Sequence, residues 1–208
     1  MPLLREMAGR MQMVLTGDIC VTSYDQNTGK LLWIIDGPTE QFVASPVYNE
    51  KTKLIYITGG YPDHHILAIR PDGTGNVTKI HIVWRTNKGA AYVPSPIIEG
   101  DYFLVVSDSG VAHCFEAATG NLLWHERMGE HHASLVSANG LVYFLNDYGV
   151  MRVVKPGPEF ELIAKNELGE KCFPSPALSG GNIYIRGDKH LFCIGQEQRF
   201  HPCIFQNH

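Results

Sequence analysis

The chain has 208 residues, of which 44% are hydrophobic and 18% are charged, and its formal net charge is −4. This length is enough for one large all-β domain or two small ones with a real core. The charge provides no basic surface for nucleic acid or anionic membrane, and no apolar run approaches the ~20 residues of a membrane-spanning helix. The N-terminal residues lack the apolar stretch of a secretory signal, so we expect either a cytoplasmic protein or the loss of an upstream export segment.

Near its N-terminus the chain carries a short motif that returns in its second half. Residues 23–33 read Ser-Tyr-Asp-Gln-Asn-Thr-Gly-Lys-Leu-Leu-Trp, and residues 114–124 read Cys-Phe-Glu-Ala-Ala-Thr-Gly-Asn-Leu-Leu-Trp. Self-similarity on this scale predicts a repeat architecture. The carboxylates, glycines and tryptophans of the two copies are Asp25, Gly29, Trp33, Glu116, Gly120 and Trp124.

Paired apolar runs follow in chain order, and each pair is joined by a turn rich in Gly, Asp or Asn. The runs are 54–58 and 66–70, 103–107 and 111–116, 141–145 and 150–155, and 183–186 and 190–194. No segment has the periodicity of a long amphipathic helix. The sequence therefore predicts an all-β protein.

Two kinds of landmark set the length of the repeat. The landmarks are the dipeptides Ser45-Pro46, Ser95-Pro96 and Ser175-Pro176, with Ser134 in the fourth place, and the tryptophans Trp33, Trp84 and Trp124. A unit of about 40 residues with four short strands has the size of a propeller blade. We expect five blade units over residues 13–196, an N-terminal extension over 1–12 and a C-terminal tail over 197–208. The first unit lacks an obvious innermost strand, and the last lacks its outermost strand.

The residue types in the repeated motif suit a tight turn followed by a docking strand. Gly29 and Gly120 fall where a hairpin turns through positive φ, which glycine adopts without steric cost. Asp25 and Glu116 are expected to accept hydrogen bonds within that turn. Each tryptophan is expected to lay its ring across a neighbouring unit and to bury roughly 150–250 Å². One position in each unit must hold a small residue, because a ring or another backbone segment comes close to it. The residues at this position, which we call the slot, are Ser23, Ala68, Cys114 and Cys193.

This pattern resembles the tryptophan-docking motif of the quinoprotein-like β-propellers. That superfamily includes pyrroloquinoline quinone dehydrogenases and the outer-membrane β-barrel assembly lipoprotein. The segments 68–73, 82–85, 92–96 and 191–195 are similar to the C-terminal half of propellers of the assembly-lipoprotein type. The resemblance covers about residues 13–196. It implies a non-catalytic scaffold that binds protein or ligand in the bacterial envelope, with a periplasmic location implied by the resemblance alone.

The number of units departs from the family, whose rings generally have seven or eight blades. Five units, two of them incomplete, predict a partial ring or arc with open faces and unpaired strand edges. Three arrangements are open: a small closed ring, an arc completed by a second copy, and a fragment of a longer chain. We favour the arc or the fragment, and we expect self-association through the open edges.

The alternative function that the resemblance suggests is a fragment of a pyrroloquinoline quinone-dependent dehydrogenase. In that family the quinone lies on the propeller axis with calcium and a catalytic Asp, and alcohol-oxidising members often add a disulfide between adjacent cysteines. This chain has five cysteines and no adjacent pair, and no acidic cluster maps onto those ligands. We therefore expect neither quinone nor calcium, and we assign no catalytic, cofactor or metal residue.

Two further groups of residues are candidates for binding. The acid–His–His triplets at 63–65 and 130–132 have metal-ligand chemistry, but adjacent residues on a strand point to opposite faces, so we expect solvated loop histidines. Tyr61, Tyr92 and Tyr148 fall in turns or just before innermost strands. Aromatic rings beside a concave surface suit recognition of a protein or peptide client, so these tyrosines are the predicted partner-binding residues.

Overall fold

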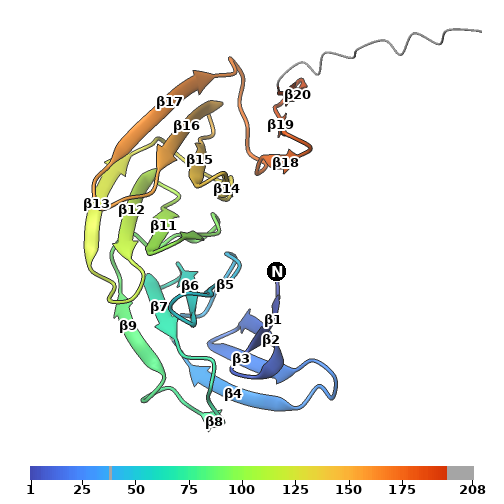
Figure 1. The fold of residues 1–208 in the computed structure, drawn as a ribbon, viewed down its shortest axis with the longest axis vertical. Coiled ribbons are helices and arrows are strands. Elements are labelled where there is room, and N and C mark those ends of the chain that lie inside the picture. Colours follow the sequence, from blue (N-terminus) through green and yellow to red (C-terminus); the bar gives the residue numbers. More distant parts are fainter. Residues whose placement is uncertain (38, 196–208) are drawn as a thin grey trace, which may run out of the picture.

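The computed structural model describes residues 1–37 and 39–195, and these residues form twenty strands and no helix. The strands make five sheets, which stand next to one another in an open arc (Figure 1). The strands β1, β5, β10, β14 and β18 lie on the inner side of the arc, and later strands of each sheet lie progressively further out. The predicted all-β propeller architecture is therefore confirmed.

The sheets follow one another along the chain. The first contains β1 (Leu3–Met7), β2 (Arg10–Gly17), β3 (Cys20–Asp25), β4 (Leu31–Asp36) and the later β8 (Gly75–Asn76). The second contains β5 (Val47–Asn49), β6 (Leu54–Gly59), β7 (His65–Ile69) and β9 (Ile82–Thr86). The third contains β10 (Ile97–Glu99), β11 (Tyr102–Val106), β12 (Val111–Glu116) and β13 (Leu122–Arg127). The fourth contains β14 (Val136–Ala138), β15 (Leu141–Leu145), β16 (Val150–Lys155) and β17 (Glu161–Glu167), and the fifth β18 (Ala177–Ser179), β19 (Asn182–Arg186) and β20 (Leu191–Ile194).

The structure corrects the expected boundary at the N-terminus. Strand β1 pairs antiparallel with β2, with Leu3 opposite Val14 and Met7 opposite Arg10. Residues 3–12 therefore belong to the first sheet, and β1 is the innermost strand that the first unit was expected to lack. The apolar pattern conceals this strand, because its middle holds Arg5 and Glu6 and only Met7 is buried. The predicted tail over 197–208 lies outside the described residues.

A long connection in the second sheet reaches back to the first. Between β7 and β9 the chain forms β8, which pairs in parallel with β4 and extends the first sheet to five strands. Val77 of this connection is 1% exposed and joins the core between the two sheets. Thr78 accepts a hydrogen bond from the Asp36 backbone N–H at 2.9 Å. The connection therefore covers the outer edge of β4, an edge that would otherwise be free to pair with other chains.

Four apolar clusters fill the junctions between successive sheets. The cluster between the first and second sheets contains Trp33, Ile35, Ile55 and Leu67, which are all fully buried. Each of the other clusters likewise combines side chains from two neighbouring sheets. Burying one such side chain is worth about 1.5–3 kcal/mol. The cores thus lie between sheets, so each sheet depends on its neighbour.

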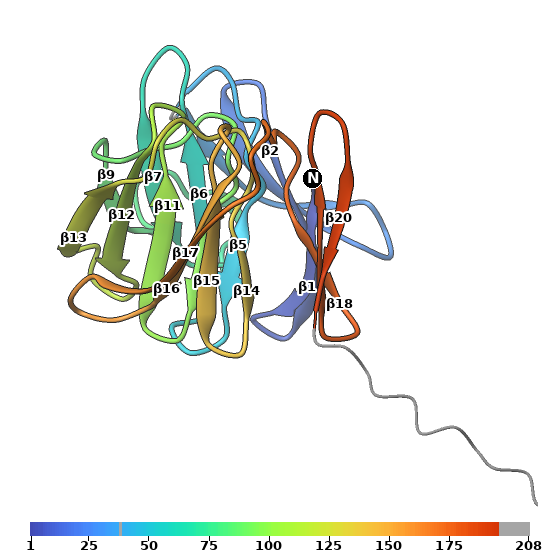
Figure 2. The ribbon, with the colours of Figure 1, turned by 90° about the horizontal axis from the view of Figure 1, so that it is seen from above.

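A chain of serine hydrogen bonds links four sheets on the inner side of the arc. The backbone N–H of Ser45 donates to Ser95 Oγ at 2.9 Å, Ser95 to Ser134 Oγ at 3.1 Å, and Ser134 to Ser175 Oγ at 2.8 Å. These serines are the landmarks that set the repeat length in the sequence. Seen from above, the turns gather at two opposite faces of the arc (Figure 2).

Candidate functional site

Two of the three tryptophans reach the next sheet through their indole N–H groups. Trp84 on β9 donates to the carbonyl of Ala117 at 2.8 Å, which joins the second sheet to the third. Trp124 on β13 donates to the carbonyl of Gly157 at 3.0 Å, which joins the third sheet to the fourth. Both acceptors lie just beyond the third strand of the following sheet, where the chain turns toward its outer strand.

Trp33 is held differently. Its side chain is fully buried between the first two sheets, but its Nε1–H donates to Gln12 Oε1 at 2.9 Å within its own sheet. Gln12 also accepts from the Ser23 hydroxyl at 2.7 Å and donates to the carbonyls of Met7 and Pro71. The buried Gln12 therefore takes the place of a carbonyl from the next sheet. No sequence pattern distinguished it from an exposed strand residue.

The small slot residues lie directly opposite the tryptophans. Ser23 pairs with Trp33, Ala68 with Trp84, and Cys114 with Trp124, and each pairing is followed by a β-bulge. All three slot residues are 0% exposed, whereas Cys193 on β20 is exposed. A larger side chain at the slot would meet the indole on the adjacent strand.

The turns before Trp33 and Trp124 have the geometry that the motif predicts for a tight turn. Asp25 Oδ1 accepts hydrogen bonds from the Thr28 hydroxyl at 2.8 Å and from the N–H groups of Thr28 and Asn27, and these bonds hold the pKa of Asp25 below its ordinary value. Glu116 accepts from the Thr119 hydroxyl. Gly29 has φ +69° and Gly120 has φ +75°. These residues therefore serve to shape the two turns.

Two of the three candidate tyrosines line one concavity, which we call the tyrosine cup. The cup has a volume of about 570 Å³ and lies where turns of the second and third sheets meet. Tyr61 follows β6, and Tyr92 lies in the loop that leads to β10. The residues that line the cup are Gln41, Gly60, Tyr61, His64, Tyr92 and Asp108.

Hydrogen bonds connect four of these residues in a single chain. Asp108 Oδ2 accepts from the Tyr92 N–H at 2.7 Å, and the Tyr92 hydroxyl donates to Gln41 Oε1 at 2.6 Å. The Gln41 N–H then donates to the Tyr61 carbonyl at 3.0 Å. A Cβ at Gly60 would lie 2.6 Å from Tyr92 Cβ, so glycine is needed for the close approach. These contacts therefore hold the Tyr92 side of the cup and the backbone of Tyr61 in place.

Tyr148, the third candidate, is not part of the cup. It lies in the turn between β15 and β16 of the fourth sheet, and its hydroxyl donates to Glu130 Oε2 at 2.9 Å. Its side chain is 56% exposed, close to the 55% of Tyr61. The structure thus brings Tyr61 and Tyr92 together and leaves Tyr148 apart.

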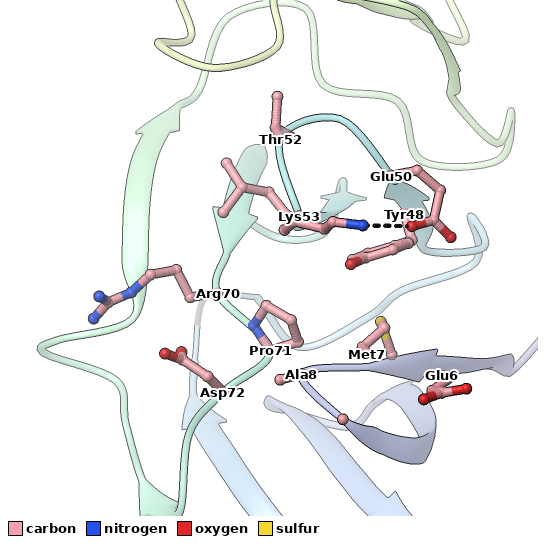
Figure 3. A pocket seen from close by; sticks show the side chains of 12 residues that line it. Glu6, Met7, Ala8, Tyr48, Glu50, Thr52, Lys53, Arg70, Pro71 and Asp72 are labelled. Carbon is pink, nitrogen blue, oxygen red and sulfur yellow. Dashed lines mark hydrogen bonds and ion pairs between the residues drawn. The ribbon is translucent and has the colours of Figure 1, made fainter.

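A second and larger concavity, of about 710 Å³, lies between the first and second sheets (Figure 3). Met7, Tyr48 and Pro71 supply apolar surface there. Most of its charged residues are already engaged, although no ion pair among the described residues involves Glu6: Lys53 pairs with Glu50 at 2.9 Å. Arg70 donates to the Ile80 carbonyl at 2.7 Å, and Asp72 pairs with His81 at 3.1 Å. This cleft therefore offers fewer free groups to a ligand than its size indicates.

The two acid–His–His triplets do not assemble metal sites. His131 is 0% exposed and packs edge-on against Phe144, and burial lowers its pKa. His132 points elsewhere and pairs with Asp147 at 2.7 Å. Within residues 1–37 and 39–195, no three or more His, Cys, Asp or Glu side chains converge to hold a metal ion.

Across the described residues, no helix is long and apolar enough to cross a membrane.

No curated protein matches the sequence. Among solved structures, the chain is similar to BamB from Moraxella catarrhalis, with 14% identity and a TM-score of 0.49 over 91% of this chain and 68% of that chain. The family model described as outer membrane protein assembly factor BamB matches residues 5–154. Because this match spans most of the sequence, the chain belongs to the BamB family of β-propeller repeat proteins.

Proposed function

We propose that this chain is a non-catalytic scaffold that binds extended protein segments in the bacterial cell envelope. Membership of a family named for outer membrane protein assembly supports the class of partner and the compartment. The observation that carries the proposal is the tyrosine cup, where Tyr61 and Tyr92 meet in one pre-formed concavity. Aromatic anchors in such sites contribute a large share of binding energy in protein interfaces.

The hydrogen-bonded walls of the cup favour binding of a segment without rearrangement. Tyr92 is held at its backbone by Asp108 and at its hydroxyl by Gln41, so little side-chain entropy is lost on binding. Tyr61 is 55% exposed and presents its ring to a partner. Burial of one tyrosine ring removes roughly 150–250 Å² from water. Main-chain pairing at a strand edge would add affinity that depends little on sequence.

The test uses short labelled peptides that alternate apolar and polar residues, the pattern of transmembrane β-strands. Fluorescence anisotropy with the purified chain measures saturable binding, and an unlabelled peptide must compete. We expect Tyr61→Ala to weaken binding by about tenfold or more, which corresponds to about 1.4 kcal/mol.

Tyr148→Ala is the matched control, because Tyr148 is as exposed as Tyr61 but lies outside the cup. It should change the dissociation constant by less than about twofold, a difference well under 1.4 kcal/mol. Absence of saturable binding by every peptide would contradict the proposed function. Equal loss of affinity in Tyr61→Ala and Tyr148→Ala would show that the cup is not the binding site.

We also propose that copies of the chain associate through the free edge of the fifth sheet. Among the described residues, β20 pairs only with β19, and most of its side chains are exposed. An exposed apolar edge strand is a template for pairing with another chain. Light scattering should find a dimer or larger species, and a monodisperse monomer would overturn this part of the proposal.

A further inference from the structure

The carboxylate of Asp108 in the tyrosine cup has no cationic partner among residues 1–37 and 39–195. Asp108 accepts hydrogen bonds from the N–H groups of Tyr92 and Val93, at 2.7 and 3.0 Å, and is half-buried. The ion pairs formed among the described residues do not include Asp108. A half-buried carboxylate without a cation leaves unused attraction in a site whose lining also includes two tyrosines, Gln41 and His64.

The walls of the cup add to that attraction. The faces of tyrosine rings carry a negative quadrupole, which attracts a cation held against them. Tyr61 and Tyr92 both line the cup, and Tyr92 is fixed in place by its bond to Gln41. The cup therefore combines aromatic faces with a carboxylate, a pairing that suits a cationic side chain.

Other occupants fit the site less well. A carboxylate would meet Asp108, and the adjoining exposed residues Glu40 and Asp63 add to the repulsion in a chain of net charge −4. A purely apolar side chain would exclude water from Asp108 without replacing its interactions, which is costly. A guanidinium or ammonium group satisfies both the rings and the carboxylate.

We propose that the protein partner inserts an arginine or lysine side chain into the tyrosine cup, with its charge directed at Asp108. This inference rests on the proposed function, because it names the side chain by which a bound segment is recognised. Arginine is the better occupant of the two, since its planar guanidinium stacks on aromatic rings and also forks toward a carboxylate.

The experiment compares four peptides that differ at one central position. The probe is acetyl-Ser-Thr-Val-Thr-X-Thr-Val-Thr-Ser-amide, where X is arginine, citrulline, leucine or glutamate. Citrulline keeps the shape of arginine and removes its charge. We expect the arginine peptide to bind about tenfold more tightly than the citrulline peptide, a difference of about 1.4 kcal/mol, and the glutamate peptide to bind most weakly. Raising NaCl from about 50 mM to about 500 mM should reduce the arginine advantage.

Substitutions in the cup show which residues produce the preference for the arginine peptide. Asp108→Asn removes the charge and keeps one of the two oxygens that accept from the Tyr92 and Val93 N–H groups, and it should reduce the arginine advantage to less than about threefold. Tyr61→Leu should reduce that advantage, whereas Tyr61→Phe keeps the aromatic face and should retain it. Tyr148→Leu, outside the cup, should leave all four affinities unchanged. Circular dichroism confirms that each variant is folded.

The outcomes separate this inference from the proposed function. If arginine and citrulline peptides bind equally and Tyr61→Leu weakens both, the cup binds protein but does not select a cation. An arginine advantage that survives both Asp108→Asn and Tyr61→Leu places the cation elsewhere and overturns the inference. If no peptide binds saturably, the proposed function fails as well.

Discussion

The first and fifth sheets are built on the same repeat but differ in what surrounds them. In the first sheet, the slot residue Ser23 is 0% exposed, and the outer strand β4 is covered by β8. In the fifth sheet, the corresponding Cys193 is exposed, and β20 has one strand partner among the described residues. Leu191 on β20 is 67% exposed, although every residue of that strand is apolar.

The difference shows where the stability of this fold resides. A blade-type sheet carries apolar residues on both faces, and these are buried only when another sheet packs against each face. The first sheet packs against the second sheet on one face, and its outer strand β4 also pairs with β8. The fifth has only the fourth sheet against it within the described residues. The first sheet contributes more buried side chains to its junction than the fifth does, so we expect the extent of docking to decide local stability more than strand pairing within a sheet does.

The largest effect should come from removing the buried indole of the first sheet. Trp33→Ala deletes a fully buried ring and its bond to Gln12, and we expect a loss of about 3–5 kcal/mol in the free energy of unfolding. Leu191→Ala in the fifth sheet should change it by less than about 0.5 kcal/mol. Urea denaturation measures both, and similar losses would mean that the two sheets are equally docked.

Gln12 is the next test of the first sheet, because it satisfies several buried polar groups at once. Gln12→Met keeps the size of the side chain but leaves the Trp33 N–H and the Ser23 hydroxyl without their acceptor. We expect a loss of about 2–4 kcal/mol. A cost below about 1 kcal/mol in urea denaturation would show that water or a rearrangement replaces these bonds.

The turn glycines distinguish backbone strain from close packing at a junction. Both Gly29 and Gly120 have positive φ, but a Cβ at Gly120 would lie 2.5 Å from the Trp84 ring, and one at Gly29 would meet nothing within 4 Å. Gly29→Ala should cost about 1 kcal/mol through its backbone alone. Gly120→Ala should cost about 2 kcal/mol or more, because it also displaces the indole. Equal costs by thermal or urea unfolding would show that Trp84 does not dock tightly on this turn.

The slot cysteines provide the smallest and most local test. Burial raises the pKa of the Cys114 thiol to about 12, whereas Cys193 is exposed. Because the thiolate is the reactive form, iodoacetamide at neutral pH should modify Cys193 within minutes and leave Cys114 intact in the folded chain. Peptide mapping by mass spectrometry reads each cysteine separately. Equal rates at both sites would contradict the difference between a docked and an undocked slot.

Much of the fold could be predicted because it is repeated. The spacing of Ser-Pro dipeptides and tryptophans located the units, and the predicted runs 111–116, 141–145 and 150–155 coincide with β12, β15 and β16. Strand β1 escaped prediction because its exposed middle is charged, so no apolar alternation marks it. Strand β8 escaped because a short parallel pairing with a distant strand leaves no local signal.

The candidate site was less predictable. Tyr61 and Tyr92 were recognised as exposed aromatic residues, but that they share one cup depends on how turns of two sheets meet. Asp108 belonged to a predicted turn, where aspartate usually caps its own backbone. Here it also caps the loop that carries Tyr92, a contact between segments that the sequence does not place together. Long-range contacts of this kind arise only from packing.

We expect that packing against a neighbouring sheet, rather than the pairing of strands within a sheet, keeps each sheet ordered. Native-state hydrogen exchange followed by mass spectrometry tests it directly, because it reports the opening free energy of each strand. The amides of β3 in the first sheet should exchange more slowly than those of β20 in the fifth by a factor on the order of a hundred or more. Equal protection of β3 and β20 would contradict the claim, since the sheet that contains β3 is docked against its neighbour more extensively than the sheet that contains β20.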